Sequence, residues 1–169
     1  MPEHFPTRVP DLTIRYATRE DVPLLLSLIR ELAEFEKLLH VVQADEATLA
    51  EELFGSTRVA EALIAELGGE PVGFALFFHN FSTFVGRKGL YLEDLYVRPH
   101  ARRRGVGRAL ITCVAKIAVE RRCGRFEWSV LDWNTRAIDF YRSLGAVAMD
   151  EWTVQRVTGE ALERLAKQG

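Results

Sequence analysis

The stretch of sequence that decides the fold is Leu-Tyr-Leu-Glu-Asp-Leu-Tyr-Val-Arg-Pro-His-Ala-Arg-Arg-Arg-Gly-Val-Gly-Arg-Ala-Leu, at residues 90–110. Its first eight residues form a largely apolar run, which predicts a buried strand that ends before Pro99. An arginine-rich loop with Gly105 and Gly107 follows, and a long amphipathic segment begins there. A strand, a glycine loop and a helix N-terminus in this order make an anion cradle, because backbone N–H groups approach the ligand and the helix dipole favours negative charge. The stretch therefore predicts a phosphate-binding site.

The whole chain has the size and composition of a soluble globular domain. It has 169 residues, 48% of them hydrophobic and 27% charged, and we expect a single domain over residues 11–169 after a loose, proline-rich tail at residues 1–10. A net charge of -2 argues against a general nucleic-acid binder, so the basic cluster indicates a local site. We expect no membrane association and a cytoplasmic location, because no apolar stretch approaches ~18 residues and no signal peptide is evident.

The residues that commonly bind metals are scattered along the chain. The two cysteines, Cys113 and Cys123, have no CxxC spacing, and the four histidines have no ligand spacing. We therefore expect two reduced structural thiols, with Cys113 on the apolar face of a helix, and no metal.

Hydrophobic periodicity predicts the order β-α-α-β-β-β-α-β-α-β-α. Gly68 and Gly69 suit a tight hairpin turn, and Thr18 and Asn134 suit helix caps. Hairpins mixed with crossovers predict an α/β (α+β mixed) fold, with a mixed sheet and helices on both faces. The predicted strands are residues 12–17, 59–67, 72–79, 90–97, 125–131 and 146–157, and the predicted helices are residues 18–39, 45–54, 105–122, 134–144 and 158–167.

The sequence of the glycine loop can be compared with three known nucleotide-binding motifs. A kinase-type P-loop requires a Lys-Ser/Thr pair, which the segment after Gly105 lacks. A dinucleotide-binding fingerprint requires a third glycine, which is also missing. The pattern that fits is Arg-x-x-Gly-x-Gly at residues 102–107, and a basic loop without any ligand is the alternative.

This hexapeptide resembles the pyrophosphate-binding motif of the GNAT acyltransferase superfamily. Residues 134–146, Asn-Thr-Arg-Ala-Ile-Asp-Phe-Tyr-Arg-Ser-Leu-Gly-Ala, resemble the second GNAT hallmark, an asparagine-capped helix that carries a tyrosine. The Tyr-Leu-Glu-Asp strand at residues 91–94 and the Glu-Leu-Ala-x-Phe-Glu helix at residues 31–36 are similar to the spermidine/spermine branch, which includes the thialysine Nε-acetyltransferases. The resemblance extends over residues ~12 to 165.

The resemblance implies the GNAT fold, with a mostly antiparallel sheet and a V-shaped splay of strands at the cofactor site. It also implies acetyl-CoA as donor, a small primary amine as acceptor, and a homodimer whose acceptor cleft is shared between subunits. The expected cofactor-binding residues are Leu95, Tyr96, Val97, Arg102, Arg103, Arg104, Gly105, Val106, Gly107, Arg108, Asn134 and Ala137.

Two residues are the candidates for catalysis. An alkyl ammonium titrates near pH 10, so attack on a thioester requires a base, and Glu93 matches the carboxylate that the family uses. Tyr141 is the expected proton donor or hydrogen-bond partner of the leaving thiolate. Because no activated serine or cysteine set is visible, we expect direct transfer rather than an acyl-enzyme.

The acceptor side is expected to be acidic and partly aromatic, which favours a cationic amine. Two departures from the polyamine enzymes, Phe84 in place of a tryptophan and Glu127 in place of a histidine, leave lysine-like amino acids and short diamines open. The candidate acceptor residues are Phe35, Glu36, Glu93, Glu127, Trp128, Asp150, Glu151 and Trp152.

Three other functions remain open at this point. A GNAT enzyme acting on a protein N-terminus or a lysine side chain would present a long acidic groove. A non-catalytic acyl-CoA sensor would bind the thioester without consuming it. An RNA-binding module built on the arginines at residues 102–104 is disfavoured by the negative net charge and the lack of basic-aromatic interleaving.

Overall fold

The computed structural model describes residues 4–169, which fall into two compact units, Met1–Ser129 and Val130–Gly169, and each unit is described here by itself. The helices and strands of the first unit are β1 (Leu12–Tyr16), α1 (Val22–Phe35), α2 (Glu46–Phe54), β2 (Glu61–Leu67), β3 (Glu70–Ser82), β4 (Arg87–Val97), α3 (Val106–Glu120) and β5 (Phe126–Trp128). The second unit holds α4 (Thr135–Ser143) and α5 (Gly159–Ala166).

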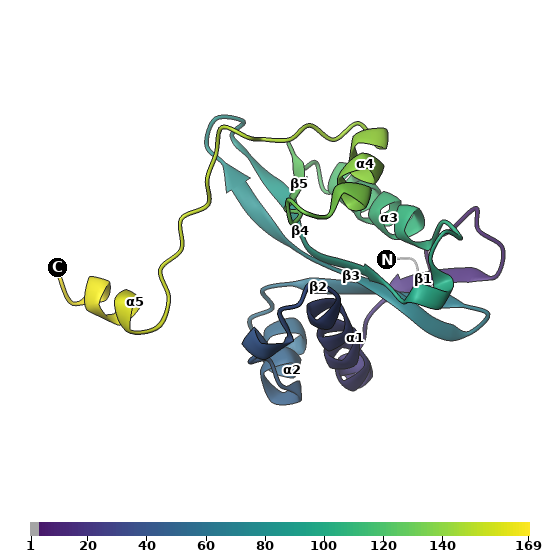
Figure 1. Cartoon of the computed structure of the whole chain (residues 1–169), viewed down its shortest axis with the longest axis horizontal. Coiled ribbons are helices and arrows are strands. Elements are labelled where there is room, and N and C mark those ends of the chain that lie inside the picture. Colours follow the sequence, from purple (N-terminus) through teal and green to yellow (C-terminus); the bar gives the residue numbers. More distant parts are fainter. Residues whose placement is uncertain (1–3) are drawn as a thin grey trace. The chain divides into compact units, whose positions relative to one another are not determined.

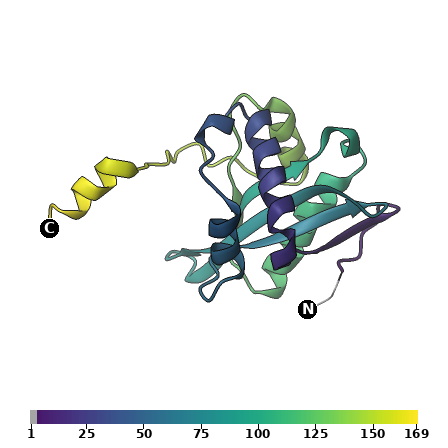
Figure 2. The same cartoon turned by 90° about the horizontal axis from the view of Figure 1, so that it is seen from below.

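The first unit is built on one five-stranded sheet in the order β1-β2-β3-β4-β5. Neighbouring strands are antiparallel except β4 and β5, which run parallel. Helices α1 and α2 lie on one face of the sheet and α3 on the other (Figure 1), and Figure 2 shows α1 lying across the strands. The predicted mixed sheet with helices on both faces is confirmed.

Local signals in the sequence account for most of these elements. Gly68 and Gly69 adopt positive φ angles of 60° and 83°, which allow the tight β2–β3 turn. Before α1, the Asp21 carboxylate accepts a hydrogen bond from the Thr18 backbone N–H at 2.7 Å. The Asp45 carboxylate caps α2 by accepting from the Thr48 backbone N–H at 2.8 Å. The acid predicted three residues after Thr18 is therefore used, whereas the Thr18 side chain makes no capping hydrogen bond and a 3₁₀ turn, Arg19–Asp21, precedes α1.

The core has two layers, one on each face of the sheet. On the α1 side, side chains of α1 and α2 pack on strand residues that include Ile64, Phe74 and Tyr96. Successive strand residues point to opposite faces, so Leu63, Ala75 and Phe77 face α3. Helix α3 supplies the apolar residues of this second layer, and its Cys113 is buried as predicted. The residues of α3 that are buried are Val106, Leu110, Ile111, Cys113, Val114, Ile117 and Ala118.

A β-bulge interrupts β4 where the site is expected. Leu76 of β3 pairs with Asp94, whereas the next residue, Phe77, pairs with Leu92, so Glu93 is the extra residue. The parallel pairing of β4 with β5 also ends at Leu92 and Trp128. Among the described residues, β4 therefore has a paired edge toward β3 and an open edge from Glu93 onward. This opening is the predicted V-shaped splay.

Some predicted boundaries are wrong for local reasons. The first helix ends at Phe35 rather than near residue 39, because Lys37 turns into a positive φ of 61°. The predicted loop at residues 80–88 is mostly strand, because β3 and β4 pair as far as Ser82 and Arg87.

The strand region predicted at residues 146–157 is absent. This segment has no regular structure, and Trp152 is 74% exposed. Alternation shows which side of a strand would be buried, but a strand also requires a neighbour for its backbone hydrogen bonds. Leu162 and Leu165, predicted to pack inward, are exposed on α5.

Part of the N-terminal segment that precedes β1 contacts the first strand. Phe5 is buried, and its backbone N–H donates to the Ile14 carbonyl at 2.8 Å. The Thr7 hydroxyl donates to the Leu12 carbonyl at 3.1 Å. These contacts attach part of the tail predicted at residues 1–10 to β1, and residues 1–3 of that tail lie outside the described residues.

The contrast between Phe74 and Phe84 tests this core. Phe74 is 0% exposed and belongs to the same cluster as Tyr96, whereas Phe84 is 98% exposed. We expect Phe74→Ala to lower the free energy of unfolding by about 3–5 kcal/mol, because the cavity cannot fully collapse. Phe84→Ala should change it by less than about 0.5 kcal/mol. Urea denaturation of both variants measures the difference, and equal losses would contradict this description of the core.

Candidate active site

The loop between β4 and α3 has the backbone geometry of an anion cradle. Gly105 caps α3 in the left-handed conformation, with φ 84°. The first hydrogen bond into the helix runs from the Ala109 N–H to the Gly105 carbonyl at 2.9 Å. The N–H groups of Val106 and Gly107 therefore have no carbonyl partner within the helix, and they lie at its positive end. These donors fit a diphosphate.

The four arginines of the loop are not equivalent. Arg103, Arg104 and Arg108 have exposed side chains, and Arg103 adopts a positive φ of 62°. Arg102 is half-buried, and its Nε donates to the Val97 carbonyl at 2.8 Å. The Arg102 guanidinium also lies over the Phe35 ring, 4.9 Å from its centroid. The exposed arginines can meet an incoming phosphate, whereas Arg102 is engaged within the protein.

The open edge of β4 leads from the bulge to this loop. Leu95, Tyr96 and Val97, the residues expected to meet the pantetheine arm, occupy it, and Tyr96 is buried. An extended arm with amide groups can bind such an edge as an added strand would. The loop, its exposed cations and the open edge together fit acetyl-CoA.

Two adjacent carboxylates at the bulge have different environments. Glu93 is exposed. The pKa of Asp94 is raised to about 7, first by desolvation and then by the nearby charges of Glu93 and Glu36. Asp94 pairs across the strands with Leu76, whose side chain belongs to the α1-side core, so Asp94 points toward α1.

Sequence reasoning assigned a role to Glu93 and none to Asp94. The available signal was the second acid within an apolar strand, because an unpaired carboxylate at such a position costs energy. The structure also adds Glu36, which follows the last residue of α1 and whose pKa is raised by burial. The three acids form an acidic cluster, which we define as Glu36, Glu93 and Asp94.

The remaining acceptor candidates of the first unit lie on β5. Glu127 accepts from the Asn80 side-chain amide at 3.5 Å and pairs with Arg125 at 3.3 Å. The Trp128 ring packs against Phe126, with ring centroids 5.0 Å apart. Both residues therefore have structural contacts within the first unit.

The other predicted site residues belong to the second unit. The Asn134 side chain caps α4 by accepting from the Ala137 N–H at 3.2 Å. Asn134, Ala137 and Tyr141 follow one another at helical spacing, so they share one side of α4. Asp150, Glu151 and Trp152 are exposed on the segment without regular structure.

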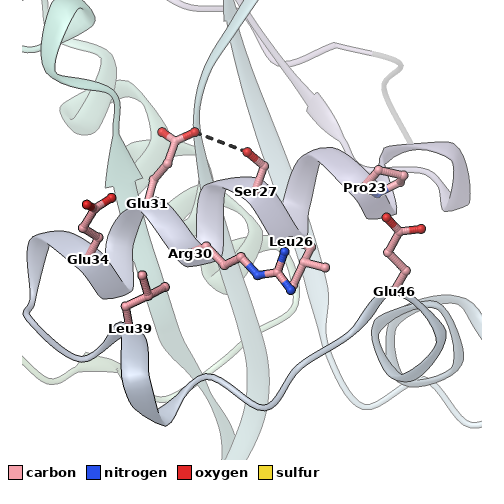
Figure 3. Close-up of a pocket in the computed structure, with 8 residues that line it drawn as sticks. All are labelled: Pro23, Leu26, Ser27, Arg30, Glu31, Glu34, Leu39 and Glu46. Atoms are coloured by element: carbon pink, nitrogen blue, oxygen red, sulfur yellow. Dashed lines mark hydrogen bonds between the residues drawn. The ribbon is translucent and has the colours of Figure 1, made fainter.

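The surface also has two shallow hollows apart from the loop and the bulge. One, of about 500 Å³, is lined by Arg87, Lys88, Arg121 and Arg122. The other, of about 300 Å³, follows α1 (Figure 3), where Ser27 and Glu31 share a hydrogen bond of 3.4 Å. No residue of the loop or of β4's open edge lines either hollow.

Two features are absent from residues 4–169. They contain no group of three or more His, Cys, Asp or Glu side chains that could hold a metal ion. No helix there has both the length and the apolar character required to span a membrane.

The fold and the loop agree with the comparison to known proteins. Residues 26–146 match the Acetyltransferase (GNAT) family. The chain belongs to this family and is an acetyltransferase.

Two relatives with named activities are similar to this chain over most of its length. The bovine (Bos taurus) thialysine N-epsilon-acetyltransferase is 42% identical over 164 residues, which cover 90% of this chain and 96% of the relative. The L-ornithine N5-acetyltransferase NATA1 of Arabidopsis thaliana is 34% identical, with 91% of this chain and 87% of the relative covered. Both relatives carry names of small-amine acetyltransferases.

A solved structure supports the same fold. An integron cassette protein from the mobile metagenome of V. cholerae superimposes with a TM-score of 0.78 at 26% identity, over 94% of this chain and 99% of that one. An aminoglycoside acetyltransferase from a soil metagenome has a TM-score of 0.74 at 22% identity, over 88% of this chain and 96% of that one, and shares the fold.

The environment of Asp94 predicts how stability depends on pH. Because its pKa is raised when folded, the neutral carboxyl stabilises the folded chain below about pH 4, and this contribution is lost as the pH rises through about 7. In Asp94→Asn this loss is absent, so the variant should gain roughly 1–2 kcal/mol relative to the wild type between pH 5 and pH 8.

Urea denaturation at several pH values measures this gain. The matched control is Asp132→Asn, at an exposed position in the second unit, which should follow the wild type. A constant difference between Asp94→Asn and the wild type over this pH range would contradict the assignment.

Proposed function

We propose that this enzyme transfers the acetyl group of acetyl-CoA to a primary amine of a small cationic acceptor, either a diamine or polyamine or a lysine analogue such as thialysine. The transfer is a direct attack within a ternary complex. The observation that carries this proposal is the acidic cluster at the β4 bulge, on the strand that leads into the phosphate-binding loop. The names of the thialysine and L-ornithine relatives support the same acceptor class.

The proposal requires the two units to work as one domain over residues 11–169. The loop and the open edge of β4 belong to the first unit, whereas Asn134, Ala137 and Tyr141 belong to the second. In the working enzyme, these α4 residues face the same acetyl-CoA that the loop holds.

Each residue has a defined part in binding the donor. The N–H groups of Val106 and Gly107 hold the diphosphate, and Arg103, Arg104 and Arg108 compensate its charge. Leu95 and Val97 present backbone groups to the amides of the arm. Bound acetyl-CoA supplies a thioester that is activated toward nitrogen nucleophiles.

The proton transfers are assigned to two side chains. Glu93, exposed at the bulge, accepts a proton from the acceptor ammonium, directly or through a water molecule. Backbone N–H groups near Tyr96 and Val97 stabilise the charge that develops on the acyl oxygen. The Tyr141 hydroxyl donates a hydrogen bond to the departing sulfur.

The acceptor site selects for positive charge. Glu36, Glu93 and Asp94 gather three acids in one place, and Phe35 adds an aromatic face beside them. A neutral or anionic acceptor would leave the negative charge of this acidic cluster uncompensated. We therefore expect diamines and basic amino acids to react faster than neutral amines.

A panel of amines tests the proposal. Thialysine, ornithine, putrescine, spermidine and a peptide with a free N-terminus are each supplied with acetyl-CoA, and thiol release is measured. We expect the cationic small amines to have the highest kcat/KM. Glu93→Gln should lower kcat by roughly 10²–10⁴-fold, because the general base is lost. Tyr141→Phe should lower kcat with little change in acetyl-CoA affinity.

Other outcomes of the panel would overturn the proposal. Preference for the peptide would indicate a protein N-acetyltransferase. Tight binding of acetyl-CoA without release of thiol in the presence of any amine would indicate a sensor. An unchanged kcat in Tyr141→Phe would remove this residue from the mechanism.

We also propose that the enzyme works as a homodimer in the cytoplasm. The segment at residues 146–157 exposes several apolar side chains, and β5 has one open edge among the described residues. Candidate acceptor residues Glu151 and Trp152 lie on this unsupported segment, so the acceptor site is incomplete unless the segment is held. A second copy of the chain supplies an apolar surface of matching kind. The exposed apolar residues of this segment are Val147, Met149, Trp152, Val154 and Val157.

Charge introduced into this segment tests the dimer. We expect the double variant Val147→Asp, Val154→Asp to be a monomer in light scattering and to lose most activity, because burial of carboxylates opposes association. The control Val119→Asp, at a position on α3 that is 77% exposed, should stay dimeric and active. A monomeric wild type would refute the proposal.

A further inference from the structure

The side chain of Arg102 connects the phosphate-binding loop to the end of α1. Arg102 is the first residue after the 3₁₀ turn Pro99–Ala101, which follows β4. Its guanidinium lies 4.9 Å from the centroid of the Phe35 ring and 5.6 Å from that of Tyr96. Its Nε donates to the Val97 carbonyl at 2.8 Å. The planar cation is therefore held by one carbonyl and two aromatic rings.

Phe35 lies directly before a residue of the acidic cluster. It is the last residue of α1, and Glu36 follows it. The chain then turns through Lys37, whose N–H donates to the Glu34 carbonyl at 3.0 Å, and the Leu38 N–H donates to the Ala33 carbonyl at 2.7 Å. This compact turn fixes Glu36 relative to the Phe35 ring.

Helix α1 is fastened to the end of β4 one turn earlier as well. The Arg98 guanidinium binds the Glu31 carboxylate, with Nη2 at 2.8 Å, and donates through Nη1 to the Pro71 carbonyl at 2.9 Å. This ion pair holds the middle of the helix to the strands. The last turn of α1 lies beyond it, and its contact with the loop is the Arg102–Phe35 stack.

We propose that Arg102 is a positioning residue that couples donor binding to acceptor binding. When the loop closes on the diphosphate, Arg102 fixes Phe35 and thereby sets Glu36 against Asp94 for the incoming cation. Binding of acetyl-CoA then orders the last turn of α1. The amine acceptor therefore binds more tightly to the enzyme that already holds acetyl-CoA. This inference rests on the proposed function for the identity of the acceptor, but the link between loop and helix is independent of it.

A direct phosphate contact by Arg102 would have different consequences. A phosphate ligand acts through its charge, which lysine retains, whereas stacking and the bond to the Val97 carbonyl depend on the planar fork of arginine. If Arg102 positions Phe35, Arg102→Lys and Arg102→Gln should therefore both weaken the coupling between CoA binding and acceptor binding. Phe35→Leu leaves Arg102 intact but removes the ring on which its guanidinium stacks. This variant should therefore lose the same coupling between CoA binding and acceptor binding.

Calorimetry with CoA and thialysine measures the coupling. In the wild type we expect saturating CoA to lower the Kd of thialysine by about 5- to 10-fold. In Arg102→Gln, Arg102→Lys and Phe35→Leu this factor should fall below about 2, while the Kd of CoA changes by less than about 3-fold. The control Arg30→Gln, at an exposed position on the same helix, should keep the wild-type factor.

Hydrogen exchange gives a readout that requires no acceptor. CoA should slow exchange at the amides of Lys37 and Leu38 in the wild type and in Arg30→Gln, but not in Arg102→Gln. This protection is expected even if thialysine is not the acceptor. A wild type that shows the protection yet acetylates no amine would therefore refute the proposed substrate class and leave the coupling intact.

Three outcomes would overturn the inference. Arg102→Gln could weaken CoA binding more than 10-fold while Arg102→Lys restores it, which would make Arg102 a phosphate ligand. The coupling factor could persist in all three variants. The wild type could show neither protection nor a change in thialysine affinity when CoA is added.

Discussion

The structure depends on one constraint, that β4 cannot pair along its whole length on both sides. It pairs with β3 as far as Val97 but with β5 only as far as Leu92, and the bulge at Glu93 lies at this point of separation. The open edge leaves backbone groups for an extended ligand, and the bulge presents two carboxylates. The strand then leads directly into the glycine loop. Donor binding and proton transfer are therefore attached to one continuous strand.

Charge is separated along this strand. The loop end is basic and the bulge is acidic, although the chain as a whole has a net charge of only -2. In the proposed function, the basic end attracts the diphosphate of the donor and the acidic end attracts the ammonium of the acceptor. Arg102 lies between the two regions, where its guanidinium is shielded by the rings of Phe35 and Tyr96.

Much of this arrangement could be predicted from local sequence. The glycine loop, the caps at Asp45 and Asn134 and the Gly68-Gly69 turn depend on residues close together in the chain, and each is present. Asp94 was missed because its raised pKa comes mainly from burial, and then from the charges of Glu93 and of Glu36, which is 58 positions away; burial and the approach of Glu36 arise only through the fold. The inward orientation of Arg102 was missed for the same reason, since Phe35 approaches it from a different helix.

The failed prediction at residues 146–157 has a different origin. The apolar residues there alternate only in two short runs, Val147 with Met149 and Trp152 with Val154, which is the pattern of one bent strand or two short strands. Pairing, however, requires a second backbone, which no periodicity within the segment supplies. The same limit applies to Leu162 and Leu165, whose spacing defines an apolar helix face without defining what covers it. A local pattern predicts an apolar surface that favours burial, but it does not identify the element that covers this surface.

The cost of the acidic cluster is itself an argument for a cationic acceptor. Burial and the nearby charges of Glu93 and Glu36 together raise the pKa of Asp94 to about 7, burial being the larger cause. An ammonium bound among them lowers this cost, so the cluster and the acceptor are complementary only when the acceptor is charged. In the proposed reaction the ammonium must then lose a proton, which leaves a carboxyl group neutral and again relieves the repulsion. Asp94, whose pKa is raised to about 7, can be charged or neutral near neutral pH, and it directly follows Glu93, the residue proposed to accept this proton. The arrangement that is costly in the free protein is therefore the one that binding and proton transfer each relieve.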